Sequence, residues 1–262
     1  MNSTHAGGGG FGDAVRSEWI KLSSLRSSRW ALVIFPITSI IFGIVIGQQS
    51  SAEWIHPTAE TIATWDPTNY ALAGLIPGYL VLPVMGLMMM TSEFAYGEIE
   101  VTLTAVPRRA VVLAAKAVVV AASAFGLSVA TAFATFFPAQ MAMNSAAPHA
   151  TLGQPGVLRA LVLSGAFLAL LSLIGLATGT VIRHTGAAVA AYFAFVLVVP
   201  DLLLALPGQI WRFGAVAILG NSVSATNLQP EFLSPWVGFA VGAGYAALAM
   251  LLALSLLQRR DA

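Results

Sequence analysis

The chain alternates between long apolar runs and short polar segments. Six runs of about twenty residues contain almost no Asp, Glu, Lys or Arg, and this is the length that an α-helix needs to cross a bilayer. They fall at residues 31–48, 71–90, 117–139, 160–182, 186–207 and 236–257. The pattern predicts an all-α, multi-pass membrane protein with six transmembrane helices. We expect a flexible tail at residues 1–12 and a single domain over residues 13–262.

The segment before the first span has its own apolar spacing. Val15, Trp19 and Leu22 recur at helical intervals, with Lys21 to the side. This predicts an interfacial helix that lies along the membrane surface and is anchored by Trp19. Arg26 projects near the apolar face and would extend toward the headgroups. The alternative is a plain basic segment next to the membrane.

Residues 208–235, between the fifth and sixth spans, contain an apolar stretch that is too short to cross. We expect one or two short re-entrant helices that dip into the outer leaflet and pack against protein, so that their backbone groups are satisfied. An apolar loop folded over the outer surface is the alternative.

Charge concentrates in the segment between the second and third spans. Residues 91–116 carry about a quarter of the charged side chains, so we expect this segment to face water. With the N-terminus in the cytoplasm, ten of the twelve basic residues lie inside, and only Arg159 and Arg212 lie outside. The distribution predicts a cell-membrane protein with both termini and residues 91–116 in the cytoplasm.

Composition excludes several classes of function. Apolar residues make up 58% of the 262 residues, and a formal net charge of +1 gives no bias toward nucleic acid. The chain has no cysteine, which excludes disulfides and thiolate metal sites. Its four histidines fall outside the spans without paired-ligand spacing, so we expect no metal site and no catalytic site.

The chain also lacks the elements of a nucleotide site. A P-loop needs Gly-x-x-x-x-Gly-Lys followed by Ser or Thr, and neither Lys21 nor Lys116, the only lysines, stands in that pattern. If ATP drives this protein, another polypeptide binds it. Asp201 is the single ionisable residue inside a predicted span and lies near its end. It has either a structural role, as a cap or a pair near Arg212, or a functional one.

Small residues recur at four-residue spacing within the spans. Such pairs let helix backbones approach closely, either within one bundle or between two copies of the chain. They are Gly43/Gly47, Gly74/Gly78, Gly175/Gly179 and Gly238/Gly242.

Several motifs occur in a characteristic order along this topology. Before the first span stand Ser17, Glu18, Lys21, Ser24, Arg26 and Trp30. After the second span stand Ser92, Glu93, Phe94, Gly97, Leu103, residues 106–109, Val112, Leu113 and Lys116. Residues 206–211 and the tail at 258–262 complete the series. In this order the chain resembles the membrane subunits of type-2 ABC exporters, particularly actinobacterial ones, over nearly its whole length.

The resemblance implies a permease that binds no cofactor itself and works with two copies of a separate ABC ATPase, which bind ATP and Mg. It also implies a second permease copy, most simply a homodimer. The helix around Trp19, Lys21 and Arg26 would be the family's connecting helix. A cytoplasmic coupling helix between spans two and three would dock on the ATPase through Glu93, Phe94, Gly97, Glu98 and Glu100.

Spans one, two and five line the transport path in that family, which makes Thr38, Met85, Met89 and Tyr192 candidate path residues. This chain has Gly97-Glu98-Ile99 where the family often has Gly-Thr-Ile, so the choice of ATPase would differ. The expected function is ATP-driven export of an apolar or amphipathic compound. The alternative is a non-transporting membrane sensor or immunity protein, and a solvated charged loop is the alternative reading of residues 91–116.

Overall fold

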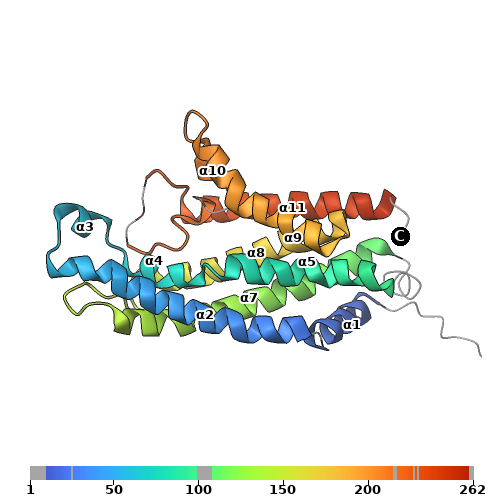
Figure 1. The fold of residues 1–262 in the computed structure, drawn as a ribbon, viewed down its shortest axis with the longest axis horizontal. Helices are drawn as coiled ribbons and strands as arrows, with labels where there is room; N and C mark the ends of the chain where they lie inside the picture. Colours follow the sequence, from blue (N-terminus) through green and yellow to red (C-terminus); the bar gives the residue numbers. More distant parts are fainter. Residues whose placement is uncertain are drawn as a thin grey trace, which may run out of the picture.

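The computed structural model describes residues 10–24, 26–98, 108–214, 217–226, 228 and 230–259, with residues 26–28 described by their backbone alone. These residues form helices and connections without a strand. The long helices run side by side and form an elongated bundle (Figure 1). The end of the bundle that holds α1 (Phe11–Ser24) is termed the basic end, and the opposite end, which holds α3 (Ala59–Thr64), is termed the far end.

Among the described residues, six helical segments are long and apolar enough to cross a membrane, as the sequence predicts. Five bundle positions are occupied by α2 (Arg26–Ser51), α5 (Gly78–Tyr96), α7 (Arg109–Ala142), α8 (Val157–Ile182) and α11 (Pro235–Arg259). The sixth is a series of α9 (Thr185–Phe193), the π-helical turn η3 (Ala194–Val198) and α10 (Val199–Leu204). Shorter elements join α2 to α5, namely η1 (Ala52–Ile55), α3, α4 (Pro67–Leu72) and η2 (Ala73–Leu75).

Several helices extend beyond the predicted spans. The helix α7 begins at Arg109 rather than at 117, and α2 begins at Arg26 rather than at 31. The length rule counts only uncharged residues, whereas a helix continues into the headgroup region where basic side chains are stable. With 34 residues, α7 is longer than the hydrocarbon core requires. The helix α1 begins at Phe11, two residues before the predicted domain boundary, and the rest of the predicted tail, residues 1–9, lies outside the described residues.

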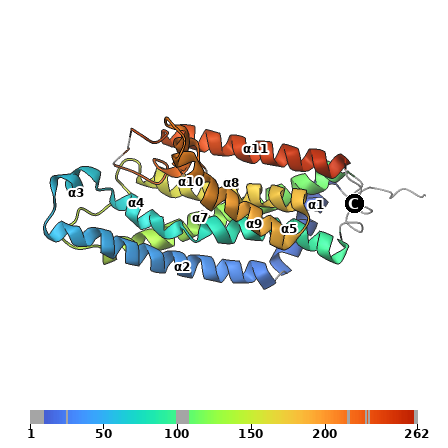
Figure 2. The ribbon, with the colours of Figure 1, turned by 45° about the horizontal axis from the view of Figure 1, so that its top comes forward.

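The centre of the bundle is α8, which packs against α5, α7 and α11. It is apolar around almost its whole circumference, and such a helix is stable when it is surrounded by others. In its most apolar stretch 72% of the residues are buried, against 17% in the α9 to α10 segment. Figure 2 shows α2 and α11 on opposite sides of the bundle, with α8 between them.

Glycines allow α5 and α8 to approach at backbone distance. A Cβ added at Gly86 would lie 2.5 Å from the carbonyl oxygen of Ser172, and one added at Gly179 would lie 2.5 Å from that of Leu87. Gly175 similarly faces the backbone of Pro83. The contacts alternate between the two helices, so the pair is held along much of its length.

The predicted glycine pairs all pack within the single chain. Atoms of α2, α4, α7 with its C-cap, α8 and the connection before α11 lie close to the Cβ positions of Gly43, Gly47, Gly74, Gly78, Gly238 and Gly242. The interpretation as packing within one bundle is therefore confirmed for these pairs.

The fifth span is irregular. A π-helical turn interrupts it at Ala194–Val198 and ends two residues before Pro200, whose missing N–H breaks the regular hydrogen-bond ladder. Beyond this point α10 extends away from the bundle (Figure 1), and none of its residues is buried. Asp201 is exposed in its first turn. Arg212 donates to Gln209 and makes no ion pair with Asp201 in the described part of the structure.

The connection from α10 to α11 contains two short 3-10 helices, η4 (Ile210–Phe213) and η5 (Ala217–Leu219). Ile218 and Leu219 are buried, so this part packs on protein. Its depth in a bilayer stays a prediction.

The helix α3 at the far end was not predicted. Thr58 caps its first turn by accepting a hydrogen bond from the Thr61 amide at 3.1 Å.

Candidate functional site

Four charged side chains from three helices form one cluster at the basic end, termed the lysine–glutamate cluster (Glu18, Lys21, Glu93 and Lys116). Glu18 and Lys21 lie on α1, Glu93 in the last turn of α5 and Lys116 in the second turn of α7. Lys116 Nζ lies 2.8 Å from Glu18 Oε2 and 2.7 Å from Glu93 Oε1. Lys21 Nζ lies 2.6 Å from Glu93 Oε1 and 3.3 Å from Glu18 Oε1. The cluster is neutral and contains both lysines of the chain.

The cluster is enclosed by protein. Lys116 is fully buried, and Glu18 and Glu93 are each 3% exposed. Burying an unpaired charge costs several kcal/mol, so these groups persist only because each ammonium bridges two carboxylates. Lys116 also lies 3.4 Å from the carbonyl oxygen of Met89, one turn before Glu93. The cluster therefore joins α1 to the end of α5 and the beginning of α7.

Local sequence explains why α1 presents its charges inward. Ala14, Glu18 and Leu22 recur at four-residue spacing and form the buried face of the helix. Lys21, three residues after Glu18, lies beside that face and is partly exposed. An acid on the buried face requires a basic partner from another helix, and Lys116 provides it.

Lys21 gives the cluster a pH dependence. Burial lowers the pKa of Lys21, but its hydrogen bond to Glu93 and the charges of Glu93 and Glu18 outweigh that effect, so the pKa is raised above 10.5. A raised lysine pKa stabilises the folded state below the unfolded-state pKa, and this contribution is lost as pH rises through the folded-state pKa. We expect the thermal midpoint of the purified protein to hold up to about pH 10 and to fall above it.

The matched variant for this prediction is Lys21→Arg. A guanidinium stays charged in this range, so the fall should be smaller than in the unmodified chain. An equal fall in both proteins would show that Lys21 does not control the alkaline loss of stability.

The charged segment is not exposed throughout, contrary to the prediction that residues 91–116 face water. Thr91, Glu93 and Lys116 are buried. The interpretation of Glu93 as a docking carboxylate on the surface is therefore wrong, because its carboxylate is used inside the bundle. The physical reason is Lys116, whose burial requires a nearby acid.

The other predicted docking residues lie beyond Glu93. Phe94 is partly buried under Arg183, whose Cζ lies 4.7 Å from the ring centroid. Gly97 ends α5 with φ of 70°, a left-handed conformation that favours glycine, and Glu98 after it is exposed. Glu100 lies outside the described residues.

Further contacts hold the helices together at the basic end. Thr185 at the beginning of α9 donates to Thr91 of α5 at 2.9 Å. Arg109 at the beginning of α7 donates to the carbonyl oxygen of Leu257 in α11 at 2.6 Å. With the lysine–glutamate cluster, these bonds connect α1, α5, α7, α9 and α11 at this end of the described structure.

A groove of about 400 Å³ lies between α2, α5 and α9. It is bordered almost entirely by apolar side chains, including Trp30 and Ile34 of α2, Met85 and Met88 of α5, and Phe193 of α9. These are the first, second and fifth spans, which the family resemblance implies for a transport path.

Of the four predicted path residues, only Met85 borders this groove. Met89 is 3% exposed and Tyr192 is 1% exposed, and the Tyr192 hydroxyl donates to the Tyr79 carbonyl at 2.8 Å. Thr38 is partly exposed and bonds to its own helix through Ile34 O at 2.7 Å. Within a single chain, Met89 and Tyr192 therefore belong to the core. The spacing of apolar residues in the sequence does not distinguish a core position from a position on the groove wall.

The structure describes the side chains of two of the three predicted interfacial residues, Trp19 and Lys21. Trp19 is 53% exposed on the outer face of α1, whereas Lys21 turns toward the cluster. Arg26 opens α2, and the prediction for its side chain lies outside the described part of the structure.

The far end is held by a buried carboxylate. Asp66 Oδ1 accepts from the amides of Thr68 and Asn69, and its Oδ2 accepts from those of Ala225 and Thr226 at 2.8 and 2.9 Å. Asp66 thus caps α4 and fixes the connection before α11 against it.

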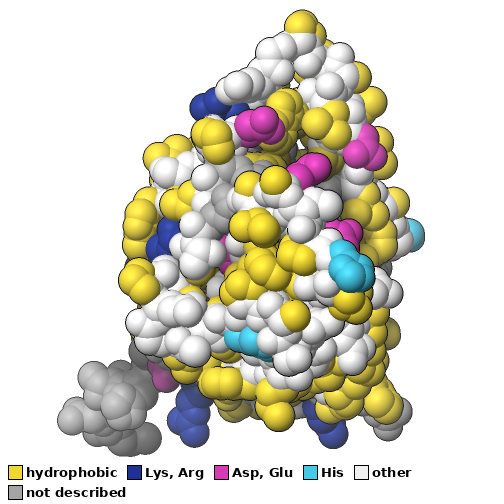
Figure 3. Space-filling model, turned by 90° about the vertical axis from the view of Figure 1, so that its left-hand side faces the viewer, with side chains coloured by type: hydrophobic (Ala, Val, Ile, Leu, Met, Phe, Trp, Pro, Cys, Tyr) yellow, Lys and Arg dark blue, Asp and Glu magenta, His cyan; other side chains and the backbone are white. Residues whose placement is uncertain are grey.

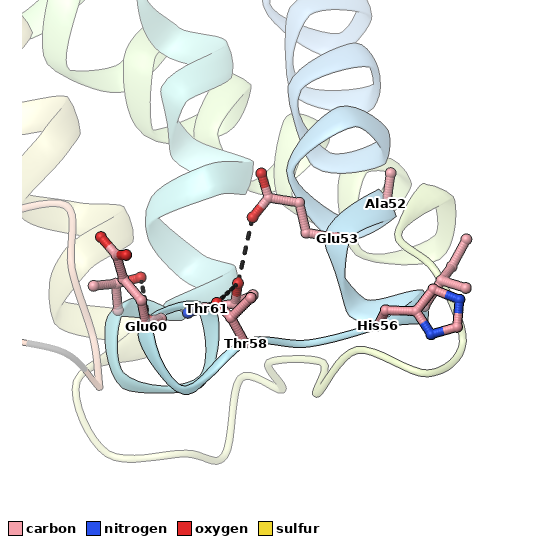
Figure 4. A pocket seen from close by; sticks show the side chains of 8 residues that line it. Ala52, Glu53, His56, Thr58, Glu60 and Thr61 are labelled. Carbon is pink, nitrogen blue, oxygen red and sulfur yellow. Dashed lines mark hydrogen bonds between the residues drawn. The ribbon is translucent and has the colours of Figure 1, made fainter.

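Figure 3, which looks onto the far end, shows acidic, basic and histidine side chains among apolar and neutral ones. An open cavity of about 650 Å³ lies there between η1 and α3. Figure 4 shows His56 and Glu60 on opposite sides of it, while Thr61 bonds to Glu53. Its ionisable groups do not converge, and over the described residues no three His, Asp or Glu side chains are grouped to hold a metal ion.

No protein-family model matches the chain, and no curated protein matches it.

Sequence reasoning missed the pairing of Glu18 with Lys116. A signal for it exists, because Lys116 follows six uncharged residues and precedes a long apolar run within one helix. A lysine at such a position either extends to water or meets an acid from another helix.

Proposed function

We propose that this protein is the permease subunit of an ATP-driven exporter, and that the lysine–glutamate cluster transmits force from a separate ABC ATPase. The observation that supports this most is the position of the cluster. It joins α1 to both helices that flank residues 97–108, so a push on that segment acts on α1, α5 and α7 together. Buried ion pairs with short distances resist separation of the helices that they join.

The docking surface in this proposal begins at Glu98. The last turn of α5 is fixed by Glu93 and by Arg183 over Phe94, which leaves Glu98 exposed immediately after the left-handed Gly97. Because the last turn of α5 is held rigidly and Glu98 is exposed beyond it, Glu98 is suited to a contact that sets the orientation and the choice of the ATPase partner. Two ATPase copies would bind ATP and Mg, and this chain would bind neither.

The groove between α2, α5 and α9 is the proposed transport path. Its apolar walls suit an apolar or amphipathic substrate, because they select by shape and leave few polar groups unpaired. Isoleucine side chains on α2, which borders the groove, are largely exposed, among them Ile37 and Ile41. In a homodimer, a second copy of the chain would cover this face and close the groove. Lipid would cover the remaining exposed apolar surface.

Orientation follows from where the basic residues lie. The basic end holds both lysines and six of the arginines, namely Arg16, Arg29, Arg108, Arg109, Arg183 and Arg259. Arg159 and Arg212 stand at the other ends of their segments. By the positive-inside rule this distribution supports our proposal that the basic end and both termini face the cytoplasm of a cell-membrane protein.

A charge reversal tests the docking surface. The tagged full chain is purified from membranes of its native host with and without Glu98→Lys, and ATP hydrolysis of the purified complex is measured. We expect the unmodified chain to bring down an ATPase with measurable turnover. Glu98→Lys should lower the recovered activity by about tenfold, because it reverses the charge that the proposed docking contact uses.

The matched control is Glu60→Lys, the same reversal at an exposed position at the far end. It should leave recovery unchanged. Absence of any ATPase with the unmodified chain would contradict the exporter and favour a non-transporting membrane protein. Equal losses in both variants would contradict docking at Glu98.

A further inference from the structure

A small apolar cavity lies where α1 turns into α2. It has a volume of about 100 Å³ and is bounded by four helices. Its walls include Trp19 and Leu22 of α1, Arg29 of α2, Met85 of α5, and Ser123 and Leu127 of α7. The residues that line this cavity differ from those that line the groove described above, except for Met85, which borders both.

The walls offer almost nothing polar to a guest. The Ser123 hydroxyl donates to the carbonyl of Val119 at 2.7 Å within its own helix, so its hydrogen bond is already used. Leu22, Met85 and Leu127 present apolar surface. Apolar cavities of this size stay dry and accept apolar guests, and about 100 Å³ holds a short run of methylene groups.

The rim of the same cavity carries groups suited to the membrane interface. Trp19 is 53% exposed, and an indole ring prefers the level of lipid headgroups. Arg29 is exposed, and its Nη2 donates to the carbonyl of Ser24 at 2.9 Å. A guanidinium has five N–H donors, so Arg29 retains donors in a geometry that matches a phosphate. Arg16, also exposed on α1, adds positive charge at this end.

We propose that this cavity is a binding site for an anionic phospholipid, with a short stretch of one acyl chain among Leu22, Met85 and Leu127 and the phosphate on Arg29. A dry apolar interior beneath a basic rim is complementary to a lipid of that charge, and neither part alone would select it. The lipid would fill the space between α1, α2 and α7 next to the lysine–glutamate cluster. It would thereby stabilise the docked position of α1.

The test compares two lipids that differ only in headgroup. The full chain is purified in mild detergent, and binding of phosphatidylglycerol and phosphatidylcholine with identical acyl chains is followed by native mass spectrometry. We expect one tightly held phosphatidylglycerol per chain and about tenfold weaker retention of phosphatidylcholine, because both lipids offer a phosphate but the choline cation cancels the net negative charge and repels the Arg29 guanidinium. Arg29→Gln should remove the preference, and the matched Arg259→Gln, at an exposed arginine of the same end, should keep it.

A second variant tests the cavity itself. Ser123→Leu would occupy it with apolar volume and should abolish retention of both lipids, whereas the same substitution at Ser255 of α11 should not. Equal retention of the two lipids by the unmodified chain would overturn the headgroup assignment. That result does not depend on whether any variant folds. Full retention in Ser123→Leu would overturn the site. The ATPase takes no part in this measurement, so its outcome is independent of the proposed export.

Discussion

Replacing Lys116 by methionine is expected to lower the free energy of unfolding by about 3–5 kcal/mol, the usual cost of removing one partner from a buried ion pair. Lys116 is fully buried and lies within 2.8 Å of Glu18 and 2.7 Å of Glu93. Methionine keeps the unbranched shape of lysine without its ammonium group, and it leaves two buried carboxylates with only the partly exposed Lys21 between them. Unfolding in mixed micelles of mild detergent and SDS measures the loss.

Two further variants separate charge from packing. Glu93→Gln combined with Lys116→Met removes one charge of each sign, so it should recover part of the lost stability. Lys21→Met alone should cost less than Lys116→Met, because the Lys21 side chain is 35% exposed and Lys116 still bridges both carboxylates. If the losses from Glu93→Gln and Lys116→Met simply add, the two residues are not coupled as their distance implies.

Gly175→Ala is expected to destabilise the bundle by about 2–3 kcal/mol, because an added methyl group would overpack the contact of α8 with α5. A Cβ at this position would lie 2.9 Å from Pro83 Cα, and the nearest atoms belong to the backbone, which cannot rotate away. The same unfolding measurement applies.

Gly126→Ala in α7 is the matched control, since no atom lies within 4 Å of its Cβ position. Alanine is the better helix former, so this variant should be neutral or more stable by up to about 1 kcal/mol. A loss in Gly126→Ala as large as in Gly175→Ala would mean that flexibility rather than close packing requires the glycines.

The spans were predictable because their physical cause is local. A run of apolar residues of sufficient length forms a helix in a bilayer whatever its neighbours are, since its backbone bonds are internal. The ends were less predictable. Arg109 and Lys116 belong to the same helix as the apolar residues after them, and only the fold shows that one contacts α11 and the other lies in a buried cluster.

The fifth span shows a second limit. Residues 186–207 were expected to form one crossing helix, and Pro200 indicates a break. The π-helical turn at Ala194–Val198 and the departure of α10 from the bundle depend on which neighbours pack against α9, and a one-dimensional pattern does not contain that information.

The sequence by itself determined that this is an all-helical chain with six apolar spans, basic residues gathered at one end and no P-loop of its own. The tertiary structure decided which charges remain available. Glu93 and Glu98 are five residues apart, and the sequence alone does not distinguish them. Glu93 is paired inside the bundle, whereas Glu98 is exposed. The reason is that Lys116 and α1 meet the last turn of α5 in space, and a charge is buried only where partners distant in the sequence surround it.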